Sequence, residues 1–437
     1  MRDMVVGIPA ASDQEFGQTG FRFLRIELLS PSVTINLKSI LAVFVYQDLD
    51  YHGSFRCDDE FLNEIYDTAA YTCHLNMQTM LWDGIKLDRM VWIGDMHPEM
   101  LTIRSVFGRQ PIIEKSMDFA MWQAPLPGWM NDFPTYSMWW VQLMWDWYWY
   151  TRDITFLQER RDYLSGLLRQ LSDLIDTDGS DHIPDYFLDW PTRGTAAAVS
   201  GSRSLLRLAL QAGANIAKLF ADKSLTELCL QKLAFMYCQK ENYGEFKQTA
   251  AFLVLSGAMT AEDAANEILS KNGAQGLSTF LSYYTLKMLA EGGYKAEAMR
   301  QLREYYGAML NRGATTFWED FNIDWTRNPG RIDELNDPDG FDLHGDNGAH
   351  CYTGFRHSLC HGWASGPVPF LMEQVLGIRI SEAGCTKLDI KPYLGDMRWA
   401  QGTFHTPSGI IHIRHDKRTD GTIDTEIQLP KGVIVTM

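Results

Sequence analysis

The ends of the chain alternate between apolar and polar positions, whereas its middle has a helical period. Near the N-terminus, the runs 21–28 and 39–45 alternate with the period of a β-strand and are rich in β-branched and aromatic residues. A Ser-Pro-Ser sequence at 30–32 separates them as a turn would. We therefore predict that residues 1–52 form a β-strand segment, the remnant of a β-sandwich that belongs to a longer N-terminal region.

The period changes at Asp58, and helical patterns dominate from there to about residue 375. The first predicted helix opens at Asp58-Asp59-Glu60 and carries one apolar face. About a dozen helices with short Gly- and Pro-bearing breaks, many apolar on two faces, predict a closed ring of helical hairpins over residues 53–377. No repeat of fixed period is visible, which argues against a solenoid. The other predicted helices span 112–124, 134–151, 154–177, 202–221, 224–239, 249–255, 261–271, 279–291, 295–312 and 365–376.

Strand-like alternation returns after Gly377. The predicted strands are 388–390, 409–413, 422–428 and 433–436, with turns such as Asp420-Gly421 between them. Residues 378–437 are therefore predicted to form a small C-terminal β-sheet domain.

Composition and charge narrow the class of partner. The chain has 437 residues and a formal net charge of −16, which argues against nucleic acid or an anionic membrane as partner, because phosphate binding needs a basic face. No apolar run approaches the ~20 residues that cross a bilayer. The N-terminal residues lack the apolar centre of a signal peptide, so no compartment is predicted. The seven cysteines are scattered without a CxxC pair, which favours free thiols.

Residues 80–99, MLWDGIKLDRMVWIGDMHPE, combine carboxylates with tryptophan and aliphatic residues. Burial raises a carboxyl pKa and a nearby cation lowers it, so such surroundings let one acid stay protonated beside ionised neighbours. The aromatic residues suggest a sugar, which offers apolar C–H faces and a rim of hydroxyls. The alternative is a structural loop whose aspartates cap helices and pair with cations. The carboxylates are Asp83, Asp88, Asp95 and Glu99, and the cations are Lys86 and Arg89.

A second carboxylate lies among aromatic residues in the segment 313–325, GATTFWEDFNIDW. Glycosidic hydrolysis needs one carboxyl to protonate the leaving oxygen and another to activate water. Glu319 is the candidate, although a structural loop, or Asp320 or Asp324 as the working group, fits the pattern too. Tryptophan-rich loops add four candidates for binding, because binding residues concentrate in loops. These are Trp129, Asp132, Asp189 and Trp190.

Together these stretches resemble the α-L-rhamnosidases of glycoside hydrolase family 78. DGIKLDRMVWIGD (83–95) is similar to the acidic motif of that family, and ATTFWED (314–320) to its ATT-x-W-E segment. Supporting similarity lies in 53–72, 187–191 and 358–371. The resemblance implies a mainly α fold, an (α/α)6 barrel with β-sandwich segments at both ends. It also implies inverting hydrolysis that releases terminal α-L-rhamnose from glycosides or polysaccharides.

The resemblance also implies roles for individual residues. Asp88 takes the place of the general acid and Glu319 that of the general base. The family usually has Glu at the acid position, one methylene longer than Asp88, and Cys-Pro where this chain has Gly84-Ile85. The residues expected to hold the substrate are Asp83, Arg89, Trp92, Asp95, Trp129, Asp132, Trp190 and His361.

Other interpretations remain open at this point. A carbohydrate-binding relative without turnover, or a related barrel glycosidase for another sugar, would keep most of these residues. Retention of both Asp88 and Glu319 favours an enzyme. No metal or other cofactor is predicted: the residues 336–342 lack the closing Glu of a calcium loop, and the zinc candidates have poor spacing. Those candidates are His344, His350, Cys351, His357, Cys360 and His361.

Overall fold

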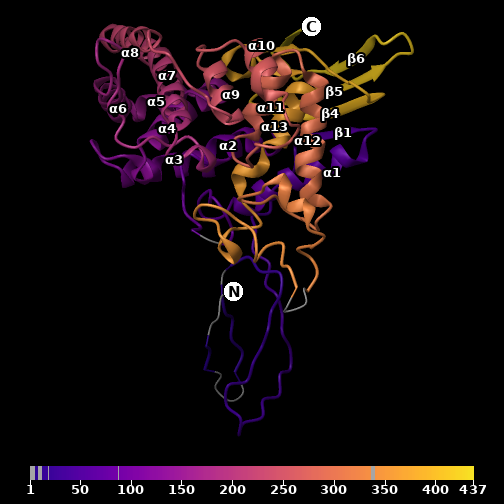
Figure 1. The fold of residues 1–437 in the computed structure, drawn as a ribbon. Coiled ribbons are helices and arrows are strands. Elements are labelled where there is room, and N and C mark those ends of the chain that lie inside the picture. Colours follow the sequence, from indigo (N-terminus) through magenta and orange to yellow (C-terminus); the bar gives the residue numbers. More distant parts are fainter. Residues whose placement is uncertain (1–4, 8–11, 18, 87, 336–339) are drawn as a thin grey trace.

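The computed structural model describes residues 5–7, 12–17, 19–86, 88–335 and 340–437. Six helices form a closed ring in which each packs against the next and the last packs against the first (Figure 1). In chain order, the ring helices are α2 (Met96–Val106), α4 (Pro134–Thr151), α7 (Ala196–Leu219), α9 (Lys247–Leu255), α11 (Ser282–Glu291) and α13 (Pro367–Gln374).

Each ring helix is preceded along the chain by a helix of a second set. This alternation makes six hairpins and confirms the predicted (α/α)6 barrel. The second set comprises α1 (Glu60–Asn76), α3 (Pro111–Gln123), α6 (Arg161–Asp173), α8 (Lys223–Met236), α10 (Ala261–Ala264) and α12 (Lys295–Leu310), with the short α5 (Ile154–Glu159) before α6.

Helix composition follows position in the barrel. The ring helix α4 buries Trp139, Trp140 and Trp147, as expected for a helix that is covered on most sides. The helix α6 of the second set buries a single stripe of leucines and turns polar residues outward. The side chain of Asp59 caps α1 by accepting hydrogen bonds from the amides of Phe61 and Leu62.

Most helices lie where the apolar period placed them, with three differences. The ring helix α2 was not predicted, because its first turn continues the carboxylate-rich stretch and contains Pro98. The predicted helix 154–177 is divided at Arg160. The predicted helix 261–271 is one α-helical turn followed by the π-helical segment Ala265–Leu269.

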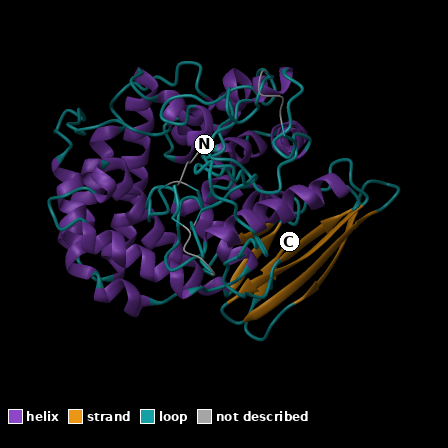
Figure 2. Cartoon of the chain, turned by 90° about the horizontal axis from the view of Figure 1, so that it is seen from below, coloured by secondary structure: helices purple, strands orange, loops and turns teal. Residues whose placement is uncertain are grey.

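Two small sheets flank the helices on one side (Figure 2). Strands lie at all four ranges predicted after Gly377, and β2 (Ile378–Ile380) and β4 (Trp399–Thr406) were not predicted. A four-stranded antiparallel sheet has the order β1 (Ser54–Cys57), β4 (Trp399–Thr406), β5 (Gly409–Lys417) and β6 (Ile423–Gln428). A three-stranded sheet has the order β2 (Ile378–Ile380), β3 (Lys387–Ile390) and β7 (Ile434–Thr436). Because β1 pairs with β4, the C-terminal sheet takes its edge strand from the start of the range predicted as barrel.

The strands predicted at 21–28 and 39–45 are absent from the described part of the N-terminal segment. Residues 23–46 are exposed throughout, and the apolar side chains among them have no second layer to pack against. Alternation produces a strand only where a partner takes up the backbone hydrogen bonds and one face is buried. The segment extends away from the helices in Figure 1. The division of the chain at residues 52 and 377 stays a prediction.

Within the described residues, no helix is both long and apolar enough to cross a bilayer.

Candidate active site

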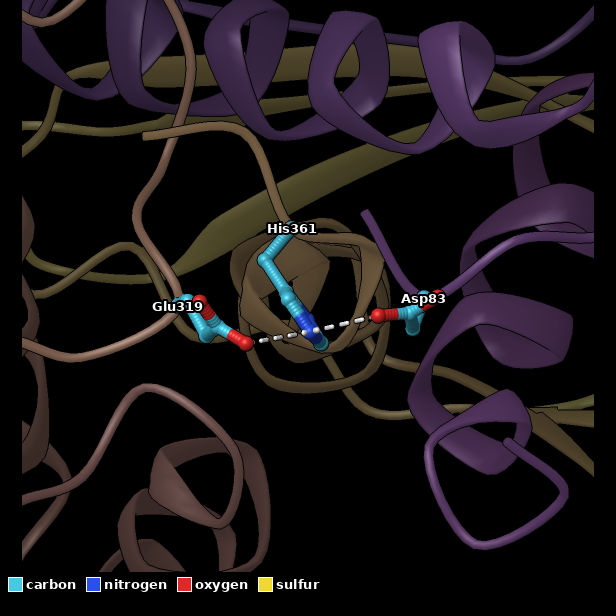
Figure 3. A group of neighbouring side chains, drawn as sticks. All are labelled: Asp83, Glu319 and His361. Atoms are coloured by element: carbon cyan, nitrogen blue, oxygen red, sulfur yellow. Dashed lines mark ion pairs between the residues drawn. The ribbon is translucent and has the colours of Figure 1, made fainter. Parts of the chain in front are cut away.

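Three carboxylates surround one histidine. The Nε2 atom of His361 lies 3.4 Å from Glu319 Oε1, 3.6 Å from Asp83 Oδ2 and 3.9 Å from Asp95 Oδ2. All four side chains are buried. Figure 3 shows His361 between Asp83 and Glu319, which come from distant parts of the chain. We call Asp83, Asp95, Glu319 and His361 the carboxylate–histidine group.

Backbone hydrogen bonds bring the two motif stretches together. The Gly362 amide donates to Asp83 O (2.8 Å), the His361 amide to Phe317 O (3.0 Å) and the Glu319 amide to Ser358 O (2.9 Å). Gly84 and His361 form an isolated antiparallel bridge. The loop before α2, the loop after α12 and the loop before α13 are therefore one connected unit at the end of the ring.

The charges in this group differ although its members are neighbours. Burial lowers the pKa of His361, but hydrogen bonds to Asp83 and Glu319 outweigh it and raise that pKa well above its usual value. Burial likewise raises the pKa of Glu319, but His361 and the Ser358 amide, 2.6 Å from Oε2, bring the net pKa below its usual value. His361 is therefore an imidazolium beside an ionised Glu319 near neutral pH.

Three carboxyls of the first stretch have pKa values shifted in the other direction, and for Asp83 burial is the main cause. Burial raises the pKa of Asp95 to about 8, and the donor hydroxyl of Tyr136, 2.9 Å from Oδ1, offsets only part of this. Burial also raises the pKa of Glu99 well above its usual value, and among the described residues neither oxygen has a hydrogen-bond partner. Protonated and ionised carboxyls therefore lie side by side, as the sequence predicts for residues 80–99.

Asp88 differs from this group in exposure. Its side chain is exposed, and within the described residues no hydrogen bond or ion pair joins it to Glu319. Asp88 and Arg89 both have left-handed backbones, with φ of 58° and 51°. Two hydrogen bonds join Asp83, which precedes these residues in the chain, to Met90, which directly follows them. Asp83 N donates to Met90 O (3.0 Å), and Met90 N donates to Asp83 Oδ1 (2.9 Å). The role of Asp88 as acid stays a prediction.

Two of the predicted binding residues, Trp92 and Trp190, pack edge-on against tyrosines. Trp92 packs edge-on to Tyr136 with ring centroids 5.8 Å apart, which places it next to the partner of Asp95. Trp190 packs edge-on to Tyr352 at 5.7 Å and is partly exposed.

The remaining candidates lie farther from the group. Arg89 extends over the ring of Trp82, with its guanidinium carbon 6.0 Å from the centroid. Asp132 is exposed, Trp129 is half-buried, and in the described part of the chain neither side chain hydrogen-bonds to the carboxylate–histidine group.

Sequence reasoning missed several residues that position this site. Asn131 accepts from Ile93 N (3.0 Å) and donates to Val91 O (2.9 Å), so it fixes the backbone on both sides of Trp92. Tyr136 and Ser358 hold Asp95 and Glu319 by single hydrogen bonds. Asn131 lies between two residues that the loop argument did select. Ser358 opens the segment 358–371 that the family resemblance selected, and Tyr136 has no comparable signal in the sequence.

Three other candidate carboxylates differ from Glu319 in environment: Asp320 and Asp324 from its own segment, and Asp189 from the tryptophan-rich loops. Asp324 is partly exposed and pairs with the exposed Arg327 at 2.9 Å, which is a surface ion pair. Asp320 is more enclosed, and burial raises its pKa to about 6. Asp189 accepts from Ser278 Oγ (2.5 Å) and from Trp190 N (2.8 Å), and burial raises its pKa to about 7. Glu319 alone of these four contacts His361.

One set of described residues has the spacing of a metal site. Ligand atoms of Asp83, Glu319 and His361 lie within 4.8 Å of one another. The same three side chains are also joined as ion pairs, because His361 Nε2 lies 3.6 Å from Asp83 Oδ2 and 3.4 Å from Glu319 Oε1. Of the other zinc candidates, His344 and His357 pack ring to ring at 4.5 Å, and burial lowers their pKa values to about 3 and about 4.

The residues 336–339 of the calcium-loop candidate lie outside the described residues.

Comparison with known proteins shows the family of this chain. A family model for the bacterial α-L-rhamnosidase six-hairpin glycosidase domain matches residues 50–375. This chain belongs to that family. A curated α-L-rhamnosidase of Formosa agariphila is 28% identical over 85 residues, 20% of this chain and 9% of the relative. The family resemblance carried by the two motifs is thereby confirmed.

Solved rhamnosidases share the fold. The family 78 rhamnosidase of Bacillus sp. GL1 superposes with a TM-score of 0.70 at 21% identity, over 89% of this chain and 43% of that one. The Streptomyces avermitilis α-L-rhamnosidase, solved in complex with L-rhamnose, superposes with a TM-score of 0.71 at 14% identity, over 89% of this chain and 39% of that one. This chain therefore spans less than half the length of either solved rhamnosidase.

Proposed function

We propose that this chain is an inverting glycoside hydrolase that releases terminal α-L-rhamnose by general acid–base catalysis. The observation that carries the proposal is Glu319, a buried carboxylate held in its ionised form by His361 in a chain of the α-L-rhamnosidase family. A rhamnose-containing glycoside or polysaccharide is the proposed substrate, and no cofactor takes part.

Glu319 is the proposed general base. A general base must be ionised and must be held within reach of the water that it deprotonates. The Ser358 amide fixes one oxygen of Glu319, and the other faces His361 at 3.4 Å. The carboxylate therefore has a fixed orientation. The positive charge of His361 stabilises the ionised carboxylate until it accepts a proton from the attacking water.

Asp88 is the proposed general acid. It belongs to the same stretch as Asp83 and Asp95, and its exposed position suits a group that must reach a glycosidic oxygen leading away from a buried sugar. In inverting glycosidases the two carboxyls are separated by roughly 6.5–9.5 Å to leave room for water. Because aspartate is one methylene shorter than glutamate, we expect the separation of Asp88 and Glu319 in the substrate complex to lie toward the long end of that range.

Asp83, Asp95 and Trp92 are the proposed contacts to the sugar. A protonated Asp95 can donate to a hydroxyl and Asp83 can accept from one, while the indole of Trp92 offers an apolar face. This combination suits a neutral deoxy sugar, and a member of the same fold was solved with L-rhamnose bound. A binding protein without turnover would need the sugar contacts but not the polarised pair of Glu319 and His361.

A panel of nitrophenyl glycosides tests the proposal. We expect the purified chain to hydrolyse the α-L-rhamnoside at least tenfold faster than the α-L-arabinoside, β-D-glucoside or α-L-fucoside. The Glu319→Gln variant should be inactive on all of them while still binding L-rhamnose. Faster turnover of another glycoside would assign a different sugar, and binding of L-rhamnose without turnover of any substrate would favour the non-catalytic relative.

A further inference from the structure

We propose that Thr19, Gly20 and Arg22, here called the N-terminal latch, position Asp88 for catalysis by holding the loop that carries it. This inference rests on the proposed function, because it assigns a positioning role in that reaction. The latch lies outside residues 50–375, the part of the chain that matches the family model.

The first set of contacts fixes the backbone just before Asp88. Gly20 N donates to Ile85 O (3.1 Å), and Thr19 Oγ1 donates to Lys86 O (3.2 Å). The approach is close, because a Cβ on Gly20 would lie 3.0 Å from the Ile85 side chain. Two consecutive carbonyls of the acid-bearing loop are thus held by the N-terminal segment.

A second set of contacts ties the latch to the loop that supports Glu319. Arg22 donates to Ile332 O, and its Nη2 lies 3.2 Å from His344 Nδ1. Lys86 Nζ donates to Phe355 O and, at 3.2 Å, to His357 O.

The Lys86 contact at His357 O lies next to the residue that holds the proposed general base, Glu319. The residue after His357 is Ser358, whose amide holds Glu319 Oε2 at 2.6 Å. Two cations therefore contact the loop that leads to Ser358: Arg22 of the latch at Ile332 and His344, and Lys86 of the acid-bearing loop, whose carbonyl the latch holds, at His357.

The backbone of Asp88 explains why such support is needed. Left-handed φ values are uncommon outside glycine, and Asp88 and Arg89 adopt them consecutively. Strained conformations of this kind persist only where the surrounding structure fixes them, and they cluster at functional sites. The two hydrogen bonds between Asp83 and Met90 hold the backbone directly after Arg89. The latch holds the backbone carbonyls of Ile85 and Lys86, which precede Asp88.

The burial pattern separates the latch from the rest of its segment. Thr19, Gly20 and Arg22 are half-buried, whereas every residue from 23 to 46 is exposed. In Figure 1 the segment extends away from the barrel and returns, and its start lies beside the loops around residues 330–357. Hydrogen bonds from Thr19, Gly20 and Arg22, and not burial of apolar residues, join the segment to the site.

Matched variants within the segment test the inference. Arg22→Ala and Thr19→Val remove latch contacts. Arg25→Ala and Thr34→Val are controls, because Arg25 pairs with the exposed Glu27 at 2.8 Å, its one ion pair among the described residues, and Thr34 is exposed. Hydrogen exchange followed by mass spectrometry is read on peptides that contain Asp88 to Met90. We expect about tenfold faster exchange in the latch variants, no change in the controls, and equal thermal unfolding of all four proteins.

Activity gives the second readout. The latch variants should lose about tenfold in kcat on a natural rhamnoside, and less than threefold on nitrophenyl α-L-rhamnoside, whose leaving group needs little protonation. KM should change little on either. Exchange identical to that of the controls would overturn the latch. So would faster exchange with equal loss of kcat on both substrates, because Asp88 would then not be the group that is positioned. A wild-type chain that hydrolyses no rhamnoside would overturn the proposed function, while the exchange experiment would still decide whether the contacts hold the loop.

Discussion

At the scale of single residues, His361 joins the three carboxylates of the candidate site. It faces three carboxylates with one nitrogen and keeps Glu319 ionised against the effect of burial. The sequence predicts the carboxylates and their aromatic surroundings, and the resemblance names His361 only as a substrate contact. Its central position depends on the backbone pairing of three distant loops, which no local pattern reveals.

Replacement of His361 by Gln should shift the pH dependence of activity. His361 lowers the pKa of Glu319, so without the imidazolium burial raises that pKa and Glu319 becomes protonated at higher pH. The acidic limb of the kcat/KM profile, which reports ionisation of the free base, should therefore move to higher pH, with a lower maximum. The profile is measured with nitrophenyl α-L-rhamnoside between pH 4 and 8. An unchanged acidic limb would mean that His361 does not set the ionisation of the base.

Asp88→Asn and Glu319→Gln should differ in how they respond to the leaving group. Loss of a general acid costs about 10²–10⁴ in rate, and a nitrophenyl leaving group needs little protonation, so Asp88→Asn should be far less damaging on nitrophenyl α-L-rhamnoside than on a natural glycoside. Glu319→Gln should abolish turnover of both, because each requires an activated water. Steady-state kcat on the two substrates measures the contrast. Equal loss on both substrates for Asp88→Asn would remove that residue from the role of acid.

At the scale of elements, the apolar period predicts helices well and strands only where partners exist. Helix α4 has the predicted bounds because its apolar residues continue through the whole segment and Pro134 marks its first turn. Helix α2 was missed because its first turn carries carboxyls of the site. The runs 21–28 and 39–45 have the composition of strands but not the paired neighbours, so composition alone misleads there.

The short helix η6 (Gly362–Ser365) gives a test of packing beneath the site. A Cβ on residue 362 would collide with the carboxyl of Glu99, so Gly362→Ala should destabilise the fold by roughly 1–3 kcal/mol, as overpacking does. Chemical unfolding of both single variants and the double variant with Glu99→Ala measures this. The same Gly362→Ala change should cost less in the Glu99→Ala background, because the colliding carboxyl is gone. Additive costs would place the strain elsewhere.

At the scale of the whole molecule, closure of the helical ring brings the halves of the site together. The loop before α2 and the loop before α13 meet because these two helices are neighbours where the ring closes. The hairpin ring and its C-terminal sheet follow from the sequence, and the family match confirms the resemblance. The contacts of the N-terminal segment with the site could not be anticipated, since they consist mainly of hydrogen bonds to backbone carbonyls.

The anomeric configuration of the first-formed sugar tests the central claim most directly. A base that activates water on the face opposite the leaving group inverts the anomeric centre, whereas a covalent glycosyl–enzyme intermediate retains it. Proton NMR during the first minutes of hydrolysis of nitrophenyl α-L-rhamnoside, before mutarotation, distinguishes the two. We predict that β-L-rhamnose appears first and the α anomer follows as the sugar equilibrates. Initial formation of α-L-rhamnose would contradict the account and remove Glu319 from the role of general base.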